Sequence, residues 1–330
     1  MAAPRTHLER AEHLAESLLP DRSPKRRMLV IVNPYATTVS DRLRNLVVYA
    51  LQARYDVEAV DTEKRDHATQ LCREAAEEGY DVVVAFGGDG TVNEAANGLA
   101  GSATPLTCLP GGATNVFHRA IGIPTDVVEA TEHLLALADD FRPRRVDLGR
   151  INDRFFTFSA GIGLDASVVA RVDAHPRMKA RLGQYYYTAS AVSTFNRSYL
   201  VDPPHVRVTV GDREVEGVTV IAQNSEEYTY FGRRPIRLAP DVGLDDGSLG
   251  LVVLKRASIL ELPTVAWRAF SGRAGTLTRH RQVESFPATT AATVAATDGG
   301  TFPVQVDGDY IGQWESASFA AAPGALSVVA

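Results

Sequence analysis

A glycine-rich run with one acidic residue, Gly87-Gly88-Asp89-Gly90-Thr91, follows a valine-rich segment and precedes helix-forming residues that include Glu94. Glycines let backbone N–H groups approach a bulky anion, and the first turn of a helix has unpaired donors with a partial positive charge. The run therefore predicts a phosphate-binding loop, whereas glycines alone would indicate only a tight turn. It matches neither the Walker A pattern nor the dinucleotide fingerprint.

Asp89 is unexpected in such a loop, because a carboxylate beside a phosphate repels it. The repulsion is removed if a cation or an acceptor hydroxyl lies between the two groups. Asp89 is therefore predicted to organise Mg²⁺ or the reacting hydroxyl.

A second loop of small residues, Pro110-Gly111-Gly112-Ala113-Thr114-Asn115, follows a strand-like run at 105–109. If both preceding strands belong to one parallel sheet, both loops lie at its carboxyl edge, where ligands bind. The second loop, with Thr114 and Asn115, is therefore predicted to contact another part of the same nucleotide.

The segments around these loops alternate between short apolar runs and helical patterns. Strands are predicted at 28–32, 57–60, 81–86 and 105–109, and helices at 41–55 and 67–79. This alternation favours an α/β domain with a parallel sheet and helices on both faces. Beyond about residue 146, strand patterns at 154–159, 206–210, 218–223 and 249–254 outnumber helices, which are expected at 174–194 and 258–271. The second half is therefore predicted to be mainly antiparallel β.

Length and composition exclude several classes of protein. A single core rarely exceeds about 250–300 residues, so two domains are expected, at 28–145 and 146–324, after an N-terminal extension at 1–27. The net charge of −6 argues against nucleic acid as a partner. The two cysteines form neither a metal spacing nor a disulfide framework, which indicates the cytoplasm. No apolar run approaches the roughly 20 residues that span a bilayer, so membrane contact is expected to be peripheral only.

Six motifs in order carry a resemblance to a known family. They are Val32-Asn33-Pro34, the run 87–91 with Asn93-Glu94, the run 110–115, Val146-Asp147-Leu148-Gly149, Leu244-Asp245-Asp246-Gly247-Ser248-Leu249, and Asp307-Gly308-Asp309. Over roughly residues 28–330 the chain resembles the bacterial diacylglycerol kinase and sphingosine kinase-like lipid kinases. The resemblance implies a nucleotide-binding α/β domain, a lipid-binding β-sandwich domain and an active site between them. It also implies that the last strand, at 325–330, returns to the first domain.

The resemblance also implies roles for individual residues. ATP would contact Asn33, Thr62, the run 87–91 and Glu94. Asp246 would bind a structural Mg²⁺ with its side chain, together with the carbonyl groups of Gly243 and Ser248. Each segment also has a plainer interpretation: Asn33-Pro34 ends a strand, Thr62 caps a helix, and the Asp246-Gly247 pair forms a hairpin turn.

The reaction implied by the resemblance transfers the γ-phosphoryl group of ATP to a lipid hydroxyl. Asp309 would accept the hydroxyl proton, and Asp147 would support it from the interdomain strand. The family usually has a glutamate at the position of Asp309. It also usually has an acidic residue at the position of Val116, and without that residue the charge network around Asp89 and Asp147 loses one member here. The plainer interpretation of the segment 306–309 is a β-turn.

Further residues are candidates for phosphate and lipid contacts. His118 and Arg119 either face phosphate or lie on a solvated helix face. The candidates for an apolar lipid slot are Phe155, Phe156, Phe158, Tyr185, Tyr186, Tyr187 and Phe195, and those for anionic headgroups are Arg177, Lys179 and Arg181. The alternative for the aromatic residues is that they belong to the ordinary core. The alternative for the basic residues is that they lie on a solvated charged helix.

Diacylglycerol is the expected acceptor, and a sphingoid base or another lipid alcohol remains an alternative. NAD kinase, which has a similar glycine loop, and a non-catalytic nucleotide-binding module are the rival functions. The expected partner is a lipid substrate at a membrane surface, and a homodimer is left open.

Overall fold

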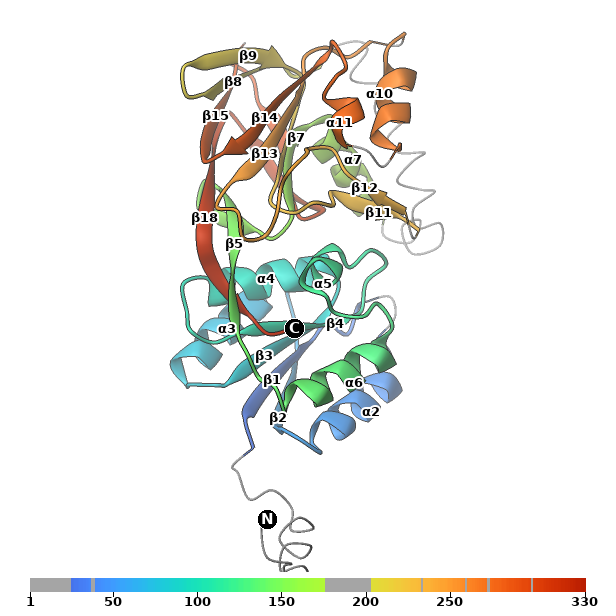
Figure 1. Cartoon of the computed structure of the whole chain (residues 1–330), viewed down its shortest axis with the longest axis vertical. Coiled ribbons are helices and arrows are strands. Elements are labelled where there is room, and N and C mark those ends of the chain that lie inside the picture. The colour runs from blue at the N-terminus through green and yellow to red at the C-terminus, as the bar shows by residue number, and fades with distance from the viewer. Residues whose placement is uncertain are drawn as a thin grey trace, which may run out of the picture.

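The computed structural model describes residues 25–36, 39–175, 203–232, 234–258, 260–271, 274–297 and 299–330. Most of the N-terminal extension, most of the helix expected at 174–194, and the candidate lipid-contacting residues from Arg177 to Phe195 lie outside these ranges. Within them the chain forms two halves stacked along the long axis of the molecule (Figure 1).

The first half is built on a parallel sheet at the predicted positions. Its strands are β1 (Arg27–Val32), β2 (Asp56–Asp61), β3 (Val82–Gly87) and β4 (Leu106–Pro110), in the order β2-β1-β3-β4. All residues of β3 and β4 are buried. Continuous apolar strands of this kind occur where both faces of a sheet are covered, so the α/β prediction for this half is confirmed.

Helices cover both faces of this sheet (Figure 1). They are α2 (Asp41–Leu51), α3 (His67–Glu77), α4 (Asp89–Leu99), α5 (Val116–Ile121) and α6 (Val127–Leu137). The prediction of a helix at 41–55 was too long. The chain leaves the helix after Leu51, and Tyr55 turns into the core, where its hydroxyl donates to the Leu134 carbonyl at 2.7 Å.

Two long strands connect the halves. β5 (Arg144–Ile151) pairs antiparallel with β18 (Ser316–Val328), and the C-terminal end of β18 pairs parallel with β4, Val328 opposite Leu106. The N-terminal part of β18 pairs with β15 (Ala291–Ala296) in the second half. One sheet therefore continues from the first half into the second, and the C-terminal residues return to the first domain.

The second half is an antiparallel β-sandwich, as predicted. One layer contains β6 (Arg154–Phe156), β8 (Val206–Val210), β9 (Arg213–Gly217) and β15, which continue the long sheet. The facing layer has the order β14-β13-β10-β7-β16-β17, with bounds Val283–Thr289, Leu249–Leu254, Thr219–Gln223, Ser159–Gly163, Phe302–Val306 and Asp309–Trp314. The two inner faces form one apolar core, in which Phe156 and Phe319 pack edge to face at 6.5 Å.

The structure corrects several sequence predictions in this half. The single strand expected at 154–159 is broken into β6 and β7, and α7 (Leu164–Asp173) was not foreseen. The helix expected at 258–271 is shorter, α10 (Leu262–Ala269), and is followed by α11 (Ala274–Leu277). Phe156 and Phe158 are core residues that are 0% and 4% exposed, so they do not line a lipid slot. Among the described helices none is long and apolar enough to cross a bilayer.

Candidate active site

The two glycine loops lie against each other at the carboxyl ends of β3 and β4. The Gly111 N–H donates to the Gly87 carbonyl at 2.9 Å. A Cβ at Gly111 would lie 2.8 Å from the Gly87 Cα atom, and one at Gly112 would lie 2.8 Å from the Gly88 Cα atom. Only glycine fits such an approach. The paired loops therefore present backbone rather than side chains beside the first turn of α4.

Asn33 and Thr91 meet beside this backbone. The Asn33 amide Nδ2 donates to Thr91 Oγ1 at 3.1 Å, and Asn33 Oδ1 accepts from the Tyr35 N–H at 2.9 Å. Thr62 follows β2 at the same sheet edge, where its N–H donates to the Val32 carbonyl at 2.8 Å. The helix-cap alternative for Thr62 is wrong, because the N-cap residue of α3 is Asp66.

Asn115 and Glu94 have clear local partners. Asn115 adopts a left-handed conformation with φ of 50°, and its side chain exchanges hydrogen bonds with the backbone N–H and carbonyl of Gly112 at 3.0 and 2.7 Å. It therefore fixes the shape of the second loop, in which Thr114 is half-buried. Glu94 Oε2 accepts from the Ala68 N–H at 3.1 Å, at the first turn of α3. Nucleotide contact by Asn115, Thr114 and Glu94 stays a prediction.

Asp89 begins α4 and is held by the first residue of α5. Its Oδ1 atom accepts a hydrogen bond from the Val116 N–H at 2.7 Å. Burial, and then the neighbouring carboxylates of Asp307 and Asp309, raise the pKa of Asp89 to about 7, although the N–H groups of Val116 and Phe117 oppose this shift. Asp89 can therefore change its charge near neutral pH.

Asp309 comes from the second half and lies directly over the glycine loop. A Cβ atom on Gly90 would stand 2.6 Å from Asp309 Oδ2, so the absence of a side chain at position 90 makes room for this carboxylate. Asp309 begins β17, whereas Gly90 and Asp89 lie in the first turn of α4. The structure thus brings together two predicted site carboxylates that are more than two hundred positions apart in the sequence.

Asp307 positions this turn, a role that the sequence analysis missed. It is 3% exposed, with φ of 48°. Its Oδ2 atom accepts from Thr157 N–H, Thr157 Oγ1 and Asn93 Nδ2 at 2.7, 2.9 and 2.8 Å, and its Oδ1 atom accepts from the Phe158 and Ser159 N–H groups at 3.0 Å each. These bonds explain why the strand expected at 154–159 is interrupted. The only feature of the sequence that pointed to this role of Asp307 was its place in an Asp-Gly turn motif.

Asn93 joins the two halves from the side of α4. It is 1% exposed, and its Nδ2 atom donates to the Phe155 carbonyl at 2.9 Å as well as to Asp307. Its Oδ1 atom accepts from the Arg154 guanidinium at 2.9 Å. Since α4 carries Asp89 and the turn after Asp307 carries Asp309, the contact between Asn93 and Asp307 fixes the two carboxylates relative to each other.

Asp147 is held by two backbone N–H groups, and its support of Asp309 stays a prediction. Its Oδ2 atom accepts from the Gly247 N–H at 2.6 Å, and its Oδ1 atom accepts from the Gly324 N–H at 2.7 Å, where β18 bulges. The carboxylates that act on Asp89 are those of Asp307 and Asp309. Asp147 therefore braces the 243–248 turn against β18, and the contacts of its carboxylate are those of a positioning residue.

This geometry predicts that Asp147→Asn destabilises the fold. Either position of the new amide places an N–H₂ group opposite a backbone N–H, so one buried donor loses its acceptor. We expect a loss of about 2–4 kcal/mol in the free energy of unfolding, measured by urea denaturation. Asp153→Asn, in an exposed hairpin turn, is the control and is expected to be neutral. An unchanged midpoint for Asp147→Asn would contradict the assignment.

Asp246 organises the 243–248 turn, but the hairpin alternative is wrong, because β13, the strand after the turn, pairs with β10 and β14 and not with the strand before it. Its carboxylate accepts from the N–H groups of Gly243 and Ser248 at 2.7 and 2.9 Å and from Ser248 Oγ at 3.0 Å. It is exposed, and each oxygen retains acceptor capacity. The donor set suits a hard cation such as Mg²⁺ if backbone carbonyls and water complete it. In the part of the chain that the structure describes, no cluster of three metal-ligating side chains exists.

His118 does not lie on a solvated helix face, because it is completely buried. Burial lowers the pKa of His118 to about 4, so the ring is neutral at physiological pH. The Arg119 guanidinium stacks over the ring of Tyr230 at 4.2 Å. This contact connects α5 with β11 (Thr229–Phe231), which pairs with β12 (Arg234–Ile236) in the second half.

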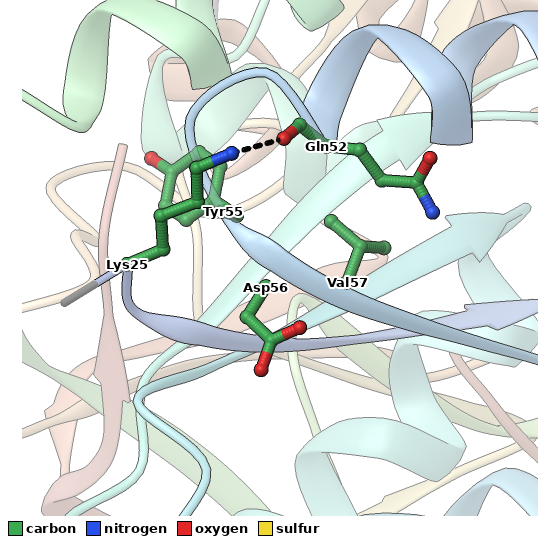
Figure 2. A pocket seen from close by; sticks show the side chains of 5 residues that line it. All are labelled: Lys25, Gln52, Tyr55, Asp56 and Val57. Atoms are coloured by element: carbon green, nitrogen blue, oxygen red, sulfur yellow. Dashed lines mark hydrogen bonds between the residues drawn. The ribbon is translucent and has the colours of Figure 1, made fainter. Parts of the chain in front are cut away.

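A depression of about 500 Å³ lies beside the start of β2 (Figure 2). It is lined by Lys25, Gln52, Tyr55, Asp56 and Val57. Asp56 and Val57 begin β2, so the depression lies at the amino edge of the parallel strands, opposite the glycine loops. Because ligands bind at the carboxyl edge of such sheets, the depression is not part of the candidate site.

Comparisons with known proteins agree with this architecture. Residues 27–151 match the family model of the diacylglycerol kinase catalytic domain, and residues 159–330 match that of the YegS C-terminal NAD kinase beta sandwich-like domain. A diacylglycerol kinase of Staphylococcus saprophyticus is 28% identical over 293 residues, covering 88% of this chain and 90% of the relative. One from Bacillus subtilis is 29% identical over 264 residues, covering 79% and 82%. A solved structure of a diacylglycerol kinase from Bacillus anthracis has a TM-score of 0.70 at 27% identity, covering 92% and 97%.

Proposed function

The chain belongs to the family of diacylglycerol kinase-like lipid kinases, and from this premise we propose that it transfers the γ-phosphoryl group of ATP to the hydroxyl of a diacylglycerol-like lipid. The observation that supports the proposal most is the meeting of Asp309 with Asp89 over the glycine loop. A phosphoryl acceptor bound between the two halves would lie beside both carboxylates.

In this proposal each part of the site has one task. The backbone of the paired glycine loops and the first turn of α4 bind the phosphates, with Asn33 and Thr91 beside them. Asp309 accepts the proton of the lipid hydroxyl while the oxygen of that hydroxyl bonds to the γ-phosphorus. The bond from that phosphorus to the bridging oxygen then breaks, and ADP leaves with the electron pair.

Charge explains why a cation is part of the proposal. Asp89, Asp307 and Asp309 are close enough for two of them to raise the pKa of the third, and the phosphates add further negative charge. Mg²⁺ supplies charge neutralisation when bound. Asp89 is the side chain that would hold it near the phosphates, and Asp246 would hold a structural ion in the 243–248 turn.

A panel of acceptors with labelled ATP tests the function. We expect label transfer to diacylglycerol in mixed micelles with Mg²⁺, none to NAD, and loss of transfer after chelation by EDTA. A sphingoid base and a monoacylglycerol complete the panel. Label on NAD alone would assign the protein to NAD kinases, and no transfer to any acceptor would favour a non-catalytic module.

A further inference from the structure

A long connection in the second half joins two strands that pair with each other. β13 and β14 are adjacent, with Leu254 opposite Val283, yet 28 residues separate these two positions along the chain. The connection contains α10 and α11 and exposes Leu260, Trp267 and Phe270 by 86%, 72% and 42%. Three large apolar side chains exposed within eleven residues of one connection indicate an interaction site more strongly than a single one does.

The same connection is strongly basic in an acidic protein. Residues 255–281 contain Lys255, Arg256, Arg268, Arg273, Arg279 and Arg281 but only one acidic residue, Glu261, whereas the whole chain carries a net charge of −6.

The acidic residue is already neutralised. Glu261 forms an ion pair with Arg281, and this contact lowers the pKa of the Glu261 carboxyl. Arg256 and Arg279 are exposed, and neither forms an ion pair with any described residue. The same connection therefore exposes cationic groups as well as Trp, Leu and Phe side chains. This combination suits the boundary of a bilayer that contains anionic lipids, where aromatic rings and Arg side chains both find favourable surroundings.

We propose that the surface formed by Arg256, Leu260, Trp267, Phe270 and Arg279, here called the α10 surface, docks on an anionic bilayer. The proposal rests on the proposed lipid kinase function, because an enzyme with a membrane-resident acceptor needs such a contact. The charge complementarity selects a bilayer rather than an apolar protein surface as the occupant.

The α10 surface is linked to the glycine loops by one short hairpin. Phe270 packs edge to face on Phe231 of β11, with ring centroids 6.0 Å apart. The preceding residue, Tyr230, lies under Arg119 of α5, which follows the second glycine loop. Figure 1 shows β11 and β12 between α5 and α10. A bilayer bound at the α10 surface is therefore connected through β11 to the elements that hold the phosphates.

The chain offers a direct reporter for this contact. It has two tryptophans, Trp267 and Trp314, so Trp314→Phe leaves Trp267 as the single fluorophore. We expect its emission to shift to the blue when vesicles of phosphatidylglycerol and phosphatidylcholine are added without nucleotide. Vesicles of phosphatidylcholine alone are expected to give little shift, and salt is expected to weaken the response.

Variants with matched controls measure the apolar and the electrostatic contributions to vesicle binding in a sedimentation assay. Trp267→Ala is expected to weaken binding at least about fivefold, and Arg256→Glu with Arg279→Glu at least about tenfold. Tyr49→Ala and Arg42→Glu change exposed residues of the same kinds on α2 and are expected to have no effect. Activity on a short-chain acceptor below its micellar concentration is expected to stay unchanged in all of these variants.

The outcomes separate this proposal from the proposed function. Vesicle binding without phosphoryl transfer would refute the kinase function and leave the docking surface standing. Transfer with no response of Trp267 to anionic vesicles would overturn the docking surface alone. A blue shift that appears without vesicles and grows with protein concentration would assign the α10 surface to a second copy of the chain, which also overturns the proposal.

Discussion

Asp89→Asn is expected to abolish phosphoryl transfer while it stabilises the ligand-free protein. The amide has nearly the same shape, and its oxygen can still accept from the Val116 N–H. It cannot hold a cation in the way a carboxylate does, so we expect turnover to fall by at least about 100-fold. The measurement is label transfer to diacylglycerol at saturating ATP.

The stability gain follows from the raised pKa of Asp89, about 7 in the folded protein against an ordinary value of 3.8. Folding therefore takes up a proton between these values, and the wild-type protein loses stability as the pH rises from about 4 to about 7. Asparagine avoids this loss, which is on the order of 4 kcal/mol at pH 8. Thermal melts should show a difference between variant and wild type that grows from pH 4 to pH 8.

Asp212→Asn, in an exposed turn, is the control and is expected to change neither turnover nor the pH dependence. Full turnover by Asp89→Asn would remove this carboxylate from the reaction. A stability difference that is independent of pH would show that Asp89 is not the group that titrates.

Asp309→Asn is expected to lower turnover by at least about 100-fold, with ATP affinity changed by no more than about twofold. The variant loses the proposed acceptor of the hydroxyl proton, whereas the backbone of the paired glycine loops is untouched. Initial rates give turnover, and equilibrium dialysis with labelled ATP gives affinity. Wild-type turnover would exclude Asp309 as the base.

Asp309→Glu tests whether the carboxylate itself or its exact position matters more for turnover. It keeps the carboxylate but adds one methylene beside Gly90, where Asp309 Oδ2 already occupies the space that a side chain would need. We expect it to retain much more turnover than Asp309→Asn. Equal losses in both variants would indicate that placement of the side chain matters more than its charge.

The parts of the protein that were predictable from the sequence are those with local causes. Valine-rich runs formed β1 and β3, and adjacent glycines formed the two loops because their backbones approach closely. The periodicity of the second half was enough to predict an antiparallel domain. It was not enough to predict the break between β6 and β7, because that break depends on hydrogen bonds to Asp307.

Roles that depend on distant contacts could not be predicted. The donors to Asp307 come from residues 148 to 214 positions away, so the segment appeared to be an ordinary turn. The hydrogen bonds from the Gly247 and Gly324 N–H groups to Asp147 were hidden for the same reason, because these residues lie 100 and 177 positions away. The burial of His118 was also hidden, because a helix as short as α5 has no clear amphipathic pattern.

The return of β18 to the first domain also governs how the protein can form during synthesis. Leu106 pairs with Val328, so the ribosome must release residue 328 before β4 acquires its second neighbour. Until then β4 offers an open edge, which invites pairing between nascent chains. Contacts at such sequence separation form slowly. The second glycine loop therefore follows an open sheet edge until residue 328 has been made, even though both glycine loops are made more than two hundred residues earlier.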